Sequence, residues 1–512
     1  MPSQWQTFPI EFRGGLISNM NPLQQGTNMV GSATFLQNFE PSKEGGYKKT
    51  LGYEKYIAGQ VAGSGAMLGV KVVNASEVIA VRENVSNVSE YYINSGATWS
   101  SLGAAASLGN RVKAVDFNFD GNHKIMFVDG VNSPAVFNDT TNTLTFPTLP
   151  SELTGATHVA SFKKALFLAK GPNLYFSAPF DETDFTPANG SGVINAGHTI
   201  TGLIVFRDQL IIFSRNKIQR LLGSSIGDFQ LVPIAEDIGC LHGETIQEVG
   251  GDVMFMAADG LRLLGATERI GDFGLEVASA PINKDALNFI NSTQTFSSYV
   301  LREKAQYRVF AYDPAVGSNV AKGIIGTKFS DQGASSINWA TTSGYKVHVS
   351  DGRYVPGQEL TVFANDDGYV YKAESGFSRD GGAIEAIYKS PFMPINDPQV
   401  RKTFYKMSLY VETAGTFSVD LNLDFDLFKV SNYTGGLANT INLTSSSAGV
   451  FVYGAPSALY GTAIYGAPLD NVYNTNVIGS GKTVSFRIED NSTNPSFSLD
   501  TAVLEFRINE RK

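Results

Sequence analysis

The feature that most constrains this chain is a hairpin-like segment that recurs at nearly even intervals. Each copy opens with a short run of β-branched or aromatic residues. The copies begin at Met67, Val112, His158, Thr201, Ile246 and Ser297. Successive starts lie 43 to 51 residues apart. A period of about 40 to 50 residues is typical of the four-stranded blades of a β-propeller. The spacing therefore predicts a propeller of six blades, with seven as the alternative count.

The residues between the strands support a chain of hairpins. Asp-Gly dipeptides supply the positive φ angles that tight hairpin turns require. They lie at 120–121, 129–130, 259–260, 351–352 and 367–368. The hairpin at 361–376 would begin a last, partial blade, closed by a strand near 52–57. A β-sandwich or another solenoid is the alternative, but sandwich strands recur every 8 to 12 residues without a superimposed longer period.

The pattern divides the chain into three parts. Residues 1–50 are rich in Gly, Asn and Pro and lack periodicity, so they are interpreted as an extended docking arm. Residues 51–382 would form the propeller. Residues 383–512 lose the period and show longer alternating strands, which predict a C-terminal β-sandwich with one buried face per sheet.

Two further segments stand out from this all-β pattern. Residues 282–291 (INKDALNFIN) are the one stretch that reads as a helix. A Tyr/Gly/Ala-rich loop at 452–468 (VYGAPSALYGTAIYGAP) interrupts the C-terminal strands. We expect this loop to contact a partner, because its aromatic residues would be costly to leave in water.

Composition and charge narrow the possible functions. The 512 residues carry a net charge of −9 and no Lys/Arg run that could neutralise a row of phosphates, so tight duplex DNA binding is not expected. No apolar run approaches the roughly 18 residues of a membrane span, and the first residues lack the pattern of a signal peptide. The sequence thus predicts a soluble protein with no membrane anchor.

The residue types that usually carry catalysis are sparse and scattered. The five histidines are His123, His158, His198, His242 and His348. Their spacing does not match a metal site. The single cysteine, Cys240, excludes an intrachain disulfide and is interpreted as a small buried hydrophobe. We therefore predict no catalytic, cofactor-binding or metal-binding residues, no cofactor, and a protein that is not an enzyme.

Three short motifs copy part of a known site or repeat but lack the rest of its pattern. GSGKT at 479–483 copies the end of a phosphate-binding loop, but Asn476 replaces its first glycine and a strand pattern follows where a helix is needed. Residues 365–368 (NDDG) resemble the start of a calcium loop, but the strand patterns TVF and YVY flank them, so they are interpreted as a hairpin turn. Residues 94–99 look like a degenerate Asp-box, a blade hairpin of sialidases, in a single copy.

Several strings resemble one known family. Residues 35–56 (FLQNFEPSKEGGYKKTLGYEKY) are similar to the opening of podovirus tail nozzle proteins, the group that includes tail tubular protein B and the packaged-DNA stabilisation proteins. The shared pattern is N-F-x-P followed by G-G-Y-x-x-x-x-G-Y. Further similar stretches lie at 127–138, 174–185, 200–265, 453–468 and 496–512. The resemblance covers nearly the whole chain.

The resemblance implies a structural virion protein without catalytic residues. It implies a β-propeller with added β-domains, assembled as a homo-hexamer below the tail adaptor of the head-to-tail connector. Such a nozzle, built in the host cytoplasm, would close the DNA exit channel, conduct double-stranded DNA through its lumen without tight binding, and meet tail fibre or spike proteins. Six copies would carry a formal charge of −54.

Two other classes of function stay open at this point. One is a receptor-binding or glycan-binding tail protein, which would need clustered aromatic residues around a pocket. The three tryptophans, Trp5, Trp99 and Trp339, are far apart in the sequence. The other is a propeller glycoside hydrolase. Its catalytic residues would be widely separated in the sequence, so the sequence alone does not identify them.

Overall fold

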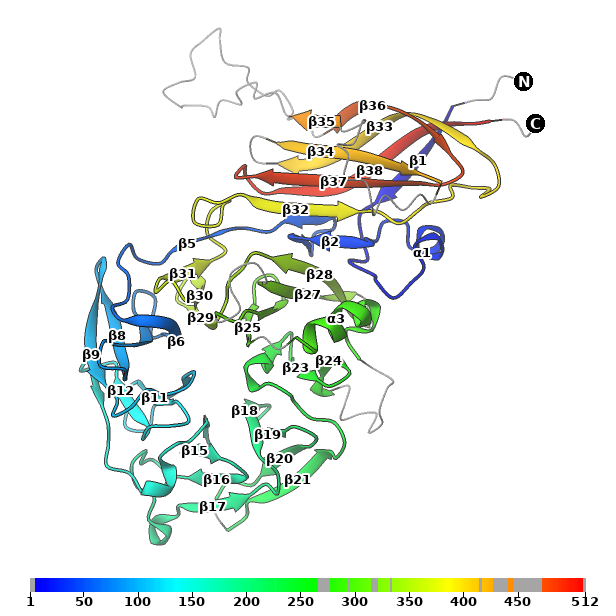
Figure 1. The fold of residues 1–512 in the computed structure, drawn as a ribbon. Helices are drawn as coiled ribbons and strands as arrows, with labels where there is room; N and C mark the ends of the chain where they lie inside the picture. The colour runs from blue at the N-terminus through cyan, green and yellow to red at the C-terminus, as the bar shows by residue number, and fades with distance from the viewer. Residues whose placement is uncertain are drawn as a thin grey trace. The chain divides into compact units, whose positions relative to one another are not determined.

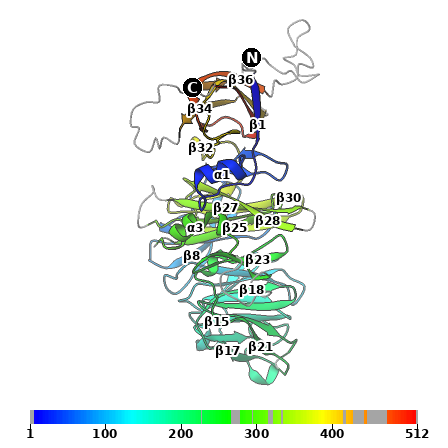
Figure 2. The ribbon, with the colours of Figure 1, turned by 90° about the vertical axis from the view of Figure 1, so that its right-hand side faces the viewer.

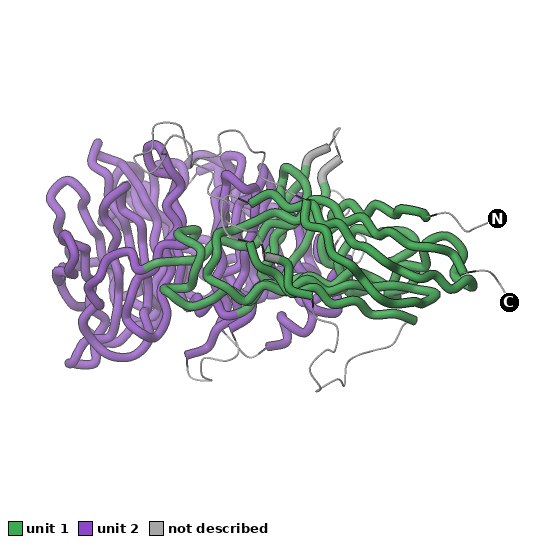
Figure 3. The backbone as a smooth tube through the Cα atoms, turned by 90° about the horizontal axis from the view of Figure 1, so that it is seen from above, with its two compact units in different colours: residues 1–54, 325–343, 374–512 green, residues 55–324, 344–373 purple. Residues whose placement is uncertain are grey.

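The computed structural model describes residues 5–225, 227–265, 277–292, 295–314, 321–331, 334–413, 417–426, 441–444 and 472–509. Strands make up 53% of the described residues and helices 7%, arranged as many small antiparallel sheets, which confirms the all-β prediction (Figure 1). The chain forms two compact units (Figure 3). Unit 1 comprises residues 1–54, 325–343 and 374–512, and unit 2 comprises residues 55–324 and 344–373.

Unit 2 begins with four sheets, each made of four consecutive strands paired in chain order. The first sheet holds β6 (Ser64–Val72), β7 (Val78–Glu83), β8 (Ser89–Ser95) and β9 (Thr98–Ala104). The second holds β10 (Lys113–Phe117), β11 (Lys124–Val128), β12 (Ala135–Asn138) and β13 (Thr143–Thr145). The third holds β14 (His158–Phe162), β15 (Ala165–Lys170), β16 (Asn173–Phe176) and β17 (Gly192–Asn195). The fourth holds β18 (Ile200–Phe206), β19 (Gln209–Ser214), β20 (Ile218–Leu222) and β21 (Gln230–Ala235).

Three further strand groups complete unit 2. A three-stranded sheet holds β22 (Gln247–Val249), β23 (Asp252–Ala257) and β24 (Gly260–Leu263). The hairpin of β25 (Phe296–Leu301) and β26 (Gln306–Ala311) follows, after helix α3 (Asn283–Ile290). The last sheet holds β29 (Val349–Val355), β30 (Gln358–Ala364), β31 (Val370–Ala373) and β5 (Tyr53–Lys55). Helix α3 and strand β5 both lie where the sequence predicted a helix and a strand.

Short 3-10 turns fill some of the connections between these strands. They are η1 (Ser151–Leu153), η2 (Pro187–Asn189), η3 (Gly243–Thr245) and η4 (Ala280–Ile282). Among the described residues, no helix combines the length and the apolar character needed to cross a membrane.

Hydrophobic clusters lie between neighbouring sheets of unit 2. Val81 of β7 and Phe127 of β11 share one cluster, and Val128 of β11 and Leu168 of β15 share the next. Such clusters also join the third sheet to the fourth, the fourth to β22–β24, and the last sheet to the first. Each of the first four sheets therefore buries both of its faces against its neighbours, which explains why its central strands are apolar on both sides.

The first strands of these sheets also meet. Contacts join β10 to β14, β14 to β18, β22 to β25, β25 to β29 and β29 to β6. The β18 strand reaches β25 through η3, which contacts both. The Val112 amide donates a 2.8 Å hydrogen bond to the Leu68 carbonyl, which joins the start of the second sheet to β6. All six predicted starting points fall in these first strands or one residue before them.

Turn chemistry was predicted only in part. Gly121, Gly130 and Gly368 have positive φ angles of 89°, 77° and 80° in the connections where the dipeptides placed turns. The turn predicted at 351–352 is wrong, because both residues lie inside β29 and Gly352 pairs with Thr361. Strand β29 pairs with β30 without interruption from Val349 to Val355, so the ladder continues through the dipeptide.

Two sharp hairpins of unit 2 contain no glycine. Lys163 and Lys164 turn between β14 and β15 with φ angles of 47° and 63°. Arg207 and Asp208 do the same between β18 and β19 with φ angles of 48° and 59°. Both pairs have the two consecutive positive φ angles of the turn type that suits the twist of a hairpin.

Unit 1 consists of two groups of strands. The first runs β3 (Phe39–Pro41), β4 (Tyr47–Lys49), β38 (Phe497–Ile508), β33 (Lys402–Thr413) and β36 (Val472–Gly481), with β1 (Gln6–Glu11) also paired to β38. The second runs β28 (Ala334–Ser343), β2 (Phe35–Gln37), β32 (Ile384–Lys389), β37 (Val484–Ser492), β34 (Ser418–Phe425) and β35 (Ile441–Thr444). Strand β27 (Lys322–Asp331) precedes β28.

Aromatic rings from the two groups pack against each other. The centroids of Phe404 on β33 and Phe425 on β34 are 5.6 Å apart. Phe12, next to β1, meets Tyr388 on β32 edge to face at 5.0 Å. Such contacts bury large apolar areas and add a modest energy of their own. The two sheets of unit 1 thus face each other across a common core.

The N-terminal residues are part of unit 1. Residues 1–50, predicted as an extended arm, contain β1 to β4 and helix α1 (Pro22–Asn28). Strand β1 runs beside β38 with Gln6 opposite Phe506, and β2 pairs with β32 (Figure 1). Figure 2 shows β1 and helix α1 of this segment in blue. The strands β2 to β4 are only three residues long, so they show no periodicity in the sequence. The arm docks on strands of its own chain.

The division of the chain also differs from the predicted boundaries at 50 and 382. Residues 325–343, predicted inside the propeller, belong to unit 1 because β28 pairs with β2, Gln37 opposite Thr341. Residues 374–382 belong to unit 1 as well. A pairing between residues 300 positions apart leaves no local signal in the sequence. The Tyr/Gly/Ala-rich loop at 452–468 lies outside the described residues.

Candidate functional site

A polar cavity of about 240 Å³ lies among the first strands of unit 2. We call it the central cavity. One lining residue from each first strand is Lys71 of β6, Lys113 of β10, His158 of β14, Leu203 of β18, Gln247 of β22, Ser298 of β25 and Asp351 of β29. A concave, enclosed space with convergent polar groups is the usual form of a ligand site in a protein.

Glycines let the first strands approach closely around this cavity. A Cβ atom on Gly202 of β18 would lie 2.2 Å from Ile246 Cδ1, and one on Gly69 of β6 would lie 2.9 Å from Val112 Cβ. A Cβ on Gly243 would lie 2.0 Å from the Thr201 carbonyl oxygen. Any larger residue at these positions would force neighbouring strands apart, so the glycines set the width of the cavity.

One ion-pair network, the Asp116 cluster, lies at one side of the cavity. Lys71 Nζ is 2.8 Å from Asp116 Oδ2 and 3.4 Å from Asp351 Oδ2, and Arg353 Nη1 is 3.1 Å from Asp116 Oδ1. Burial by itself favours the neutral amine, but Asp351 and Asp116 outweigh it and raise the pKa of Lys71. Burial likewise opposes the charge of Asp116, but Lys71 and Arg353 hold its pKa below the ordinary value. This network joins β6, β10 and β29.

A second group, the Glu244 cluster, contains Arg111, Lys113 and Glu244. Lys113 Nζ contacts Glu244 Oε1, and Arg111 Nη2 is 3.7 Å from Glu244 Oε2. Burial, with the nearby positive charge of Arg111, lowers the pKa of Lys113 well below its ordinary value. Burial also lowers the pKa of Arg111 to about 10. Two cations thus share one carboxylate in a poorly hydrated place.

The cavity continues into a wider hollow of about 500 Å³, which we call the outer hollow. His158, Gly243 and Glu244 line both spaces, and Arg111, His242 and Phe296 line the outer hollow. Burial and then Lys113 lower the pKa of His158 to about 3. Burial, Arg215 and Arg111 lower the pKa of His242. Both imidazoles are therefore neutral at pH 7 and can donate or accept hydrogen bonds.

Cys240 lies close to this region but is a poor nucleophile. Its thiol is buried and donates to the His242 carbonyl at 3.2 Å. Burial raises the pKa of this thiol to about 11, so little thiolate forms at neutral pH. Because the thiolate is the reactive form, the environment of Cys240 fits the predicted structural role and not covalent chemistry.

The structure brings together histidines that are far apart in the sequence. His158 and His242 both line the outer hollow, whereas His198 is exposed on a loop. His123 bridges two carboxylates, with Nε2 2.9 Å from Asp116 and Nδ1 3.0 Å from Asp139. His348 is largely buried. The sequence analysis did not predict that these residues share a hollow. The one local signal was that Lys113 and His158 are the first residues of β10 and β14, the first strands of two successive sheets.

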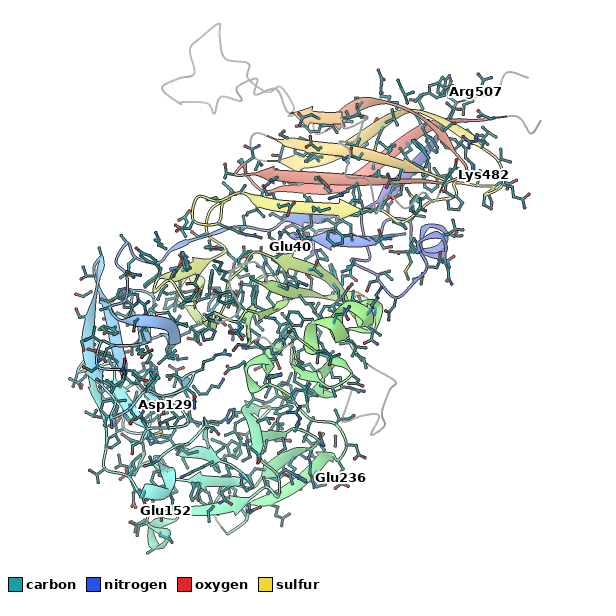
Figure 4. All side chains as sticks on the ribbon, in the orientation of Figure 1. Glu40, Asp129, Glu152, Glu236, Lys482 and Arg507 are labelled. Atoms are coloured by element: carbon teal, nitrogen blue, oxygen red, sulfur yellow. The ribbon has the colours of Figure 1, made fainter. Side chains whose placement is uncertain are left out.

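The three motifs set aside earlier lie in hairpins. Lys482 of GSGKT lies in the turn that joins β36 to β37, among strands and not at a helix N-terminus (Figure 4). Residues 365–368 connect β30 to β31, where Asp366 and Asp367 accept hydrogen bonds from the hydroxyls of Tyr312 and Tyr371. Residues 94–99 comprise the end of β8, the turn at 96–97 and the start of β9. Within the described ranges, no group of three or more His, Cys, Asp or Glu is placed to hold a metal ion.

Comparison with known proteins adds no family assignment. No protein-family model matches the chain, and no curated protein matches it. The function is therefore inferred from the sequence resemblance, the arrangement of the sheets and the chemistry of the two spaces.

Proposed function

We propose that this chain is a structural component of the tail nozzle of a short-tailed phage, which closes the DNA exit channel and conducts the genome during ejection. The sequence strings at 35–56 and elsewhere resemble nozzle proteins. The observation that carries the proposal is the succession of small sheets in unit 2, because the resemblance implies a propeller in this part of the chain.

The fold proposed for unit 2 is a seven-bladed β-propeller. Seven strand groups follow one another in chain order, and each seam between neighbours contains buried apolar side chains or first-strand contacts. The segment after β5 would close the ring. The amide of Tyr56 donates to the Val370 carbonyl at 2.8 Å, and that of Val61 donates to the Gly368 carbonyl at 2.9 Å. Such mixing of N- and C-terminal segments in one blade removes the free edges that an open array would expose.

In this proposal DNA passes between copies of the chain and not through one propeller. The central cavity of about 240 Å³ is of the size that takes small molecules. A duplex is far larger, since its major groove alone admits a whole α-helix. The channel would therefore be enclosed by a homo-hexamer, whose acidic net charge gives few cations to hold phosphates and slow the DNA.

Exposed aromatic side chains on unit 1 offer surfaces for assembly. Trp5 is 51% exposed and stacks edge to face on Tyr405, which is 40% exposed, with ring centroids 4.3 Å apart. Tyr410 and Ile478 are exposed on β33 and β36. Aromatic residues at a partly wet surface are typical of protein interfaces. We propose that neighbouring subunits, the tail adaptor, and fibre or spike proteins use such surfaces.

Electron microscopy of the purified protein and of the virion tests this proposal. We expect sixfold rings at high protein concentration and density for the chain in the tail below the adaptor. A protein that stays monomeric and is missing from the virion tail would overturn the nozzle role. In a gel-shift assay at low salt, the rings should not retard linear duplex DNA, and a tight, salt-sensitive complex would contradict the low-drag lumen.

A receptor- or glycan-binding tail protein is the second candidate, and the exposed Trp5 and Tyr405 pair favours it. Aromatic faces provide amphipathic contact surfaces at low entropic cost. Binding to host-surface glycans that is lost in Trp5→Ala, by a chain that does not form rings, would support this function over the nozzle.

A further inference from the structure

We propose that the outer hollow of unit 2 binds a small oxyanion, with Arg111 and Lys113 as its charged ligands. This site is independent of the nozzle role and deals with the inside of one subunit. The shared chemistry is that of a phosphate or sulfate group.

The first argument is the charge balance of the two clusters. In the Asp116 cluster, Lys71 and Arg353 are matched by Asp116 and Asp351. In the Glu244 cluster, Arg111 and Lys113 are matched by Glu244 alone. When both side chains are protonated, one positive charge is in excess beside a space large enough for a ligand, and burial and the charge of Arg111 lower the pKa of Lys113 because that state is unfavourable. A bound anion would compensate it where water does so poorly.

The second argument is the unused hydrogen-bonding capacity of Arg111. A guanidinium has five N–H donors. Nη1 donates to the Phe296 carbonyl at 2.7 Å, but Nη2 at 3.7 Å from Glu244 is too far for a hydrogen bond. Nε is buried and has no partner among the described residues. A guanidinium prefers the paired acceptors of a carboxylate or phosphate, so the remaining donors suit an oxyanion.

The third argument concerns the rest of the lining. His158 and His242 are neutral, so they do not compensate the positive charge of Arg111 and Lys113. That compensation is left to a bound anion. The hollow of about 500 Å³ accepts a small ion together with its remaining waters. Lys113 lines the inner cavity and Arg111 the outer hollow, so a ligand held by both must reach the boundary at Glu244. A phosphate within a duplex backbone is too bulky to do this, which favours a free anion.

Calorimetric titration of the full-length protein with inorganic phosphate, and separately with sulfate, at neutral pH and low chloride tests the site. We expect saturable binding to one site per chain. Lys113→Met should weaken it about tenfold or more, because one charge-assisted contact is lost. Glu244→Gln should tighten it several-fold, because the variant removes the negative charge that competes for both cations. If the cluster had only a structural role, the Lys113 and Glu244 substitutions would not be expected to change the phosphate affinity in opposite directions.

Glu182→Gln is the matched control. Glu182 pairs with Lys124 at 2.6 Å elsewhere in unit 2, so this variant should leave phosphate affinity unchanged. Circular dichroism melts identify variants that fail to fold. If Lys113→Met does not fold, the phosphate affinity of Glu244→Gln compared with that of Glu182→Gln still tests the proposal. The proposal is overturned if the wild type binds neither anion at tens of millimolar, or if Glu244→Gln binds no tighter than Glu182→Gln. Binding of a short DNA duplex that Lys113→Met abolishes, without binding of free phosphate, would overturn the free-anion assignment.

Discussion

Lys49 Nζ lies 2.7 Å from Asp490 Oδ2, and both side chains are 1% exposed. Lys49 ends β4 and Asp490 lies on β37, so the pair joins an N-terminal strand to a C-terminal one inside unit 1. The ammonium also donates to the Ser492 carbonyl at 3.0 Å. A buried charge is tolerated only when it is paired and hydrogen-bonded, which makes this contact sensitive to the loss of either partner.

Replacement of Lys49 by Met should destabilise the protein strongly. The variant leaves the Asp490 carboxylate buried without its cation, which typically costs about 3–5 kcal/mol. Urea denaturation followed by fluorescence would measure the change. Glu11→Gln is the control, because Glu11 and Arg13 form an exposed pair of the kind that contributes about 0–1 kcal/mol. Equal stabilities of the two variants would show that the buried pair is not important.

Arg82 should hold the closing segment of unit 2 in place. Its Nη1 donates to the Val61 carbonyl at 2.7 Å and its Nε to the Gly65 carbonyl at 3.1 Å. Arg82→Met keeps most of the apolar volume but leaves these carbonyls without their donors, at a cost of about 2 kcal/mol or more. Hydrogen exchange should show faster exchange at the Tyr56 and Val61 amides. The exposed Arg207→Met should leave those amides protected, and if Arg82→Met does too, Arg82 is not needed for closure.

His158 should make the protein less stable in mild acid. Its pKa falls from 6.5 to about 3 on folding, so between these values the unfolded chain binds a proton that the folded chain does not. Above pH 6.5 this difference in proton binding does not affect the unfolding free energy. Below pH 6.5 the unfolding free energy falls by about 1.4 kcal/mol per pH unit for one proton. His348, whose pKa is lowered to about 4, adds a similar effect over a narrower range.

Denaturation curves at a series of pH values would isolate the contribution of His158. His158→Gln should reduce the pH slope of the unfolding free energy between about pH 6 and 4 by close to one proton's worth. The exposed His198→Gln should keep the wild-type slope. A His158→Gln slope identical to that of the wild type would mean that the imidazole is not buried in its neutral form.

Cys240 should resist thiol reagents in the folded protein. Burial raises its pKa from 9.0 to about 11, which lowers the thiolate fraction at neutral pH about a hundredfold even before access is considered. Labelling with a chromogenic disulfide should therefore be at least that much slower in buffer than in guanidinium. Fast labelling of the folded chain would contradict the buried, protonated thiol.

Much of the local structure could be predicted from the sequence. The six repeat starts all lie in first strands or one residue before them, and 282–291 contains helix α3. These features depend on β-branched runs, turn residues and helical spacing within a few positions. The error at 351–352 arises because pairing with the neighbouring strand, and not the turn residues, decides the conformation there.

The candidate site could not be predicted in the same way. Arg111 and Lys113 are close in the sequence, but Glu244 and His242 join them only because η3 contacts both β18 and β25. Neither the hydrophobic alternation nor the residue spacing of a sequence predicts which charged side chains will meet across a cavity. The pKa values of Lys113 and His158 likewise depend on burial by strands from other sheets.

The sequence by itself determined the all-β class, the interval of the hairpins and the position of the strand that completes the last sheet, because these depend on turn and strand preferences of neighbouring residues. Only the tertiary structure decided that β1 to β4 pair with C-terminal strands, that residues 325–343 belong to unit 1, and that Lys49 meets Asp490. Those contacts depend on backbone edges and charges that find partners hundreds of residues away, where burial, and not local preference, sets the free energy.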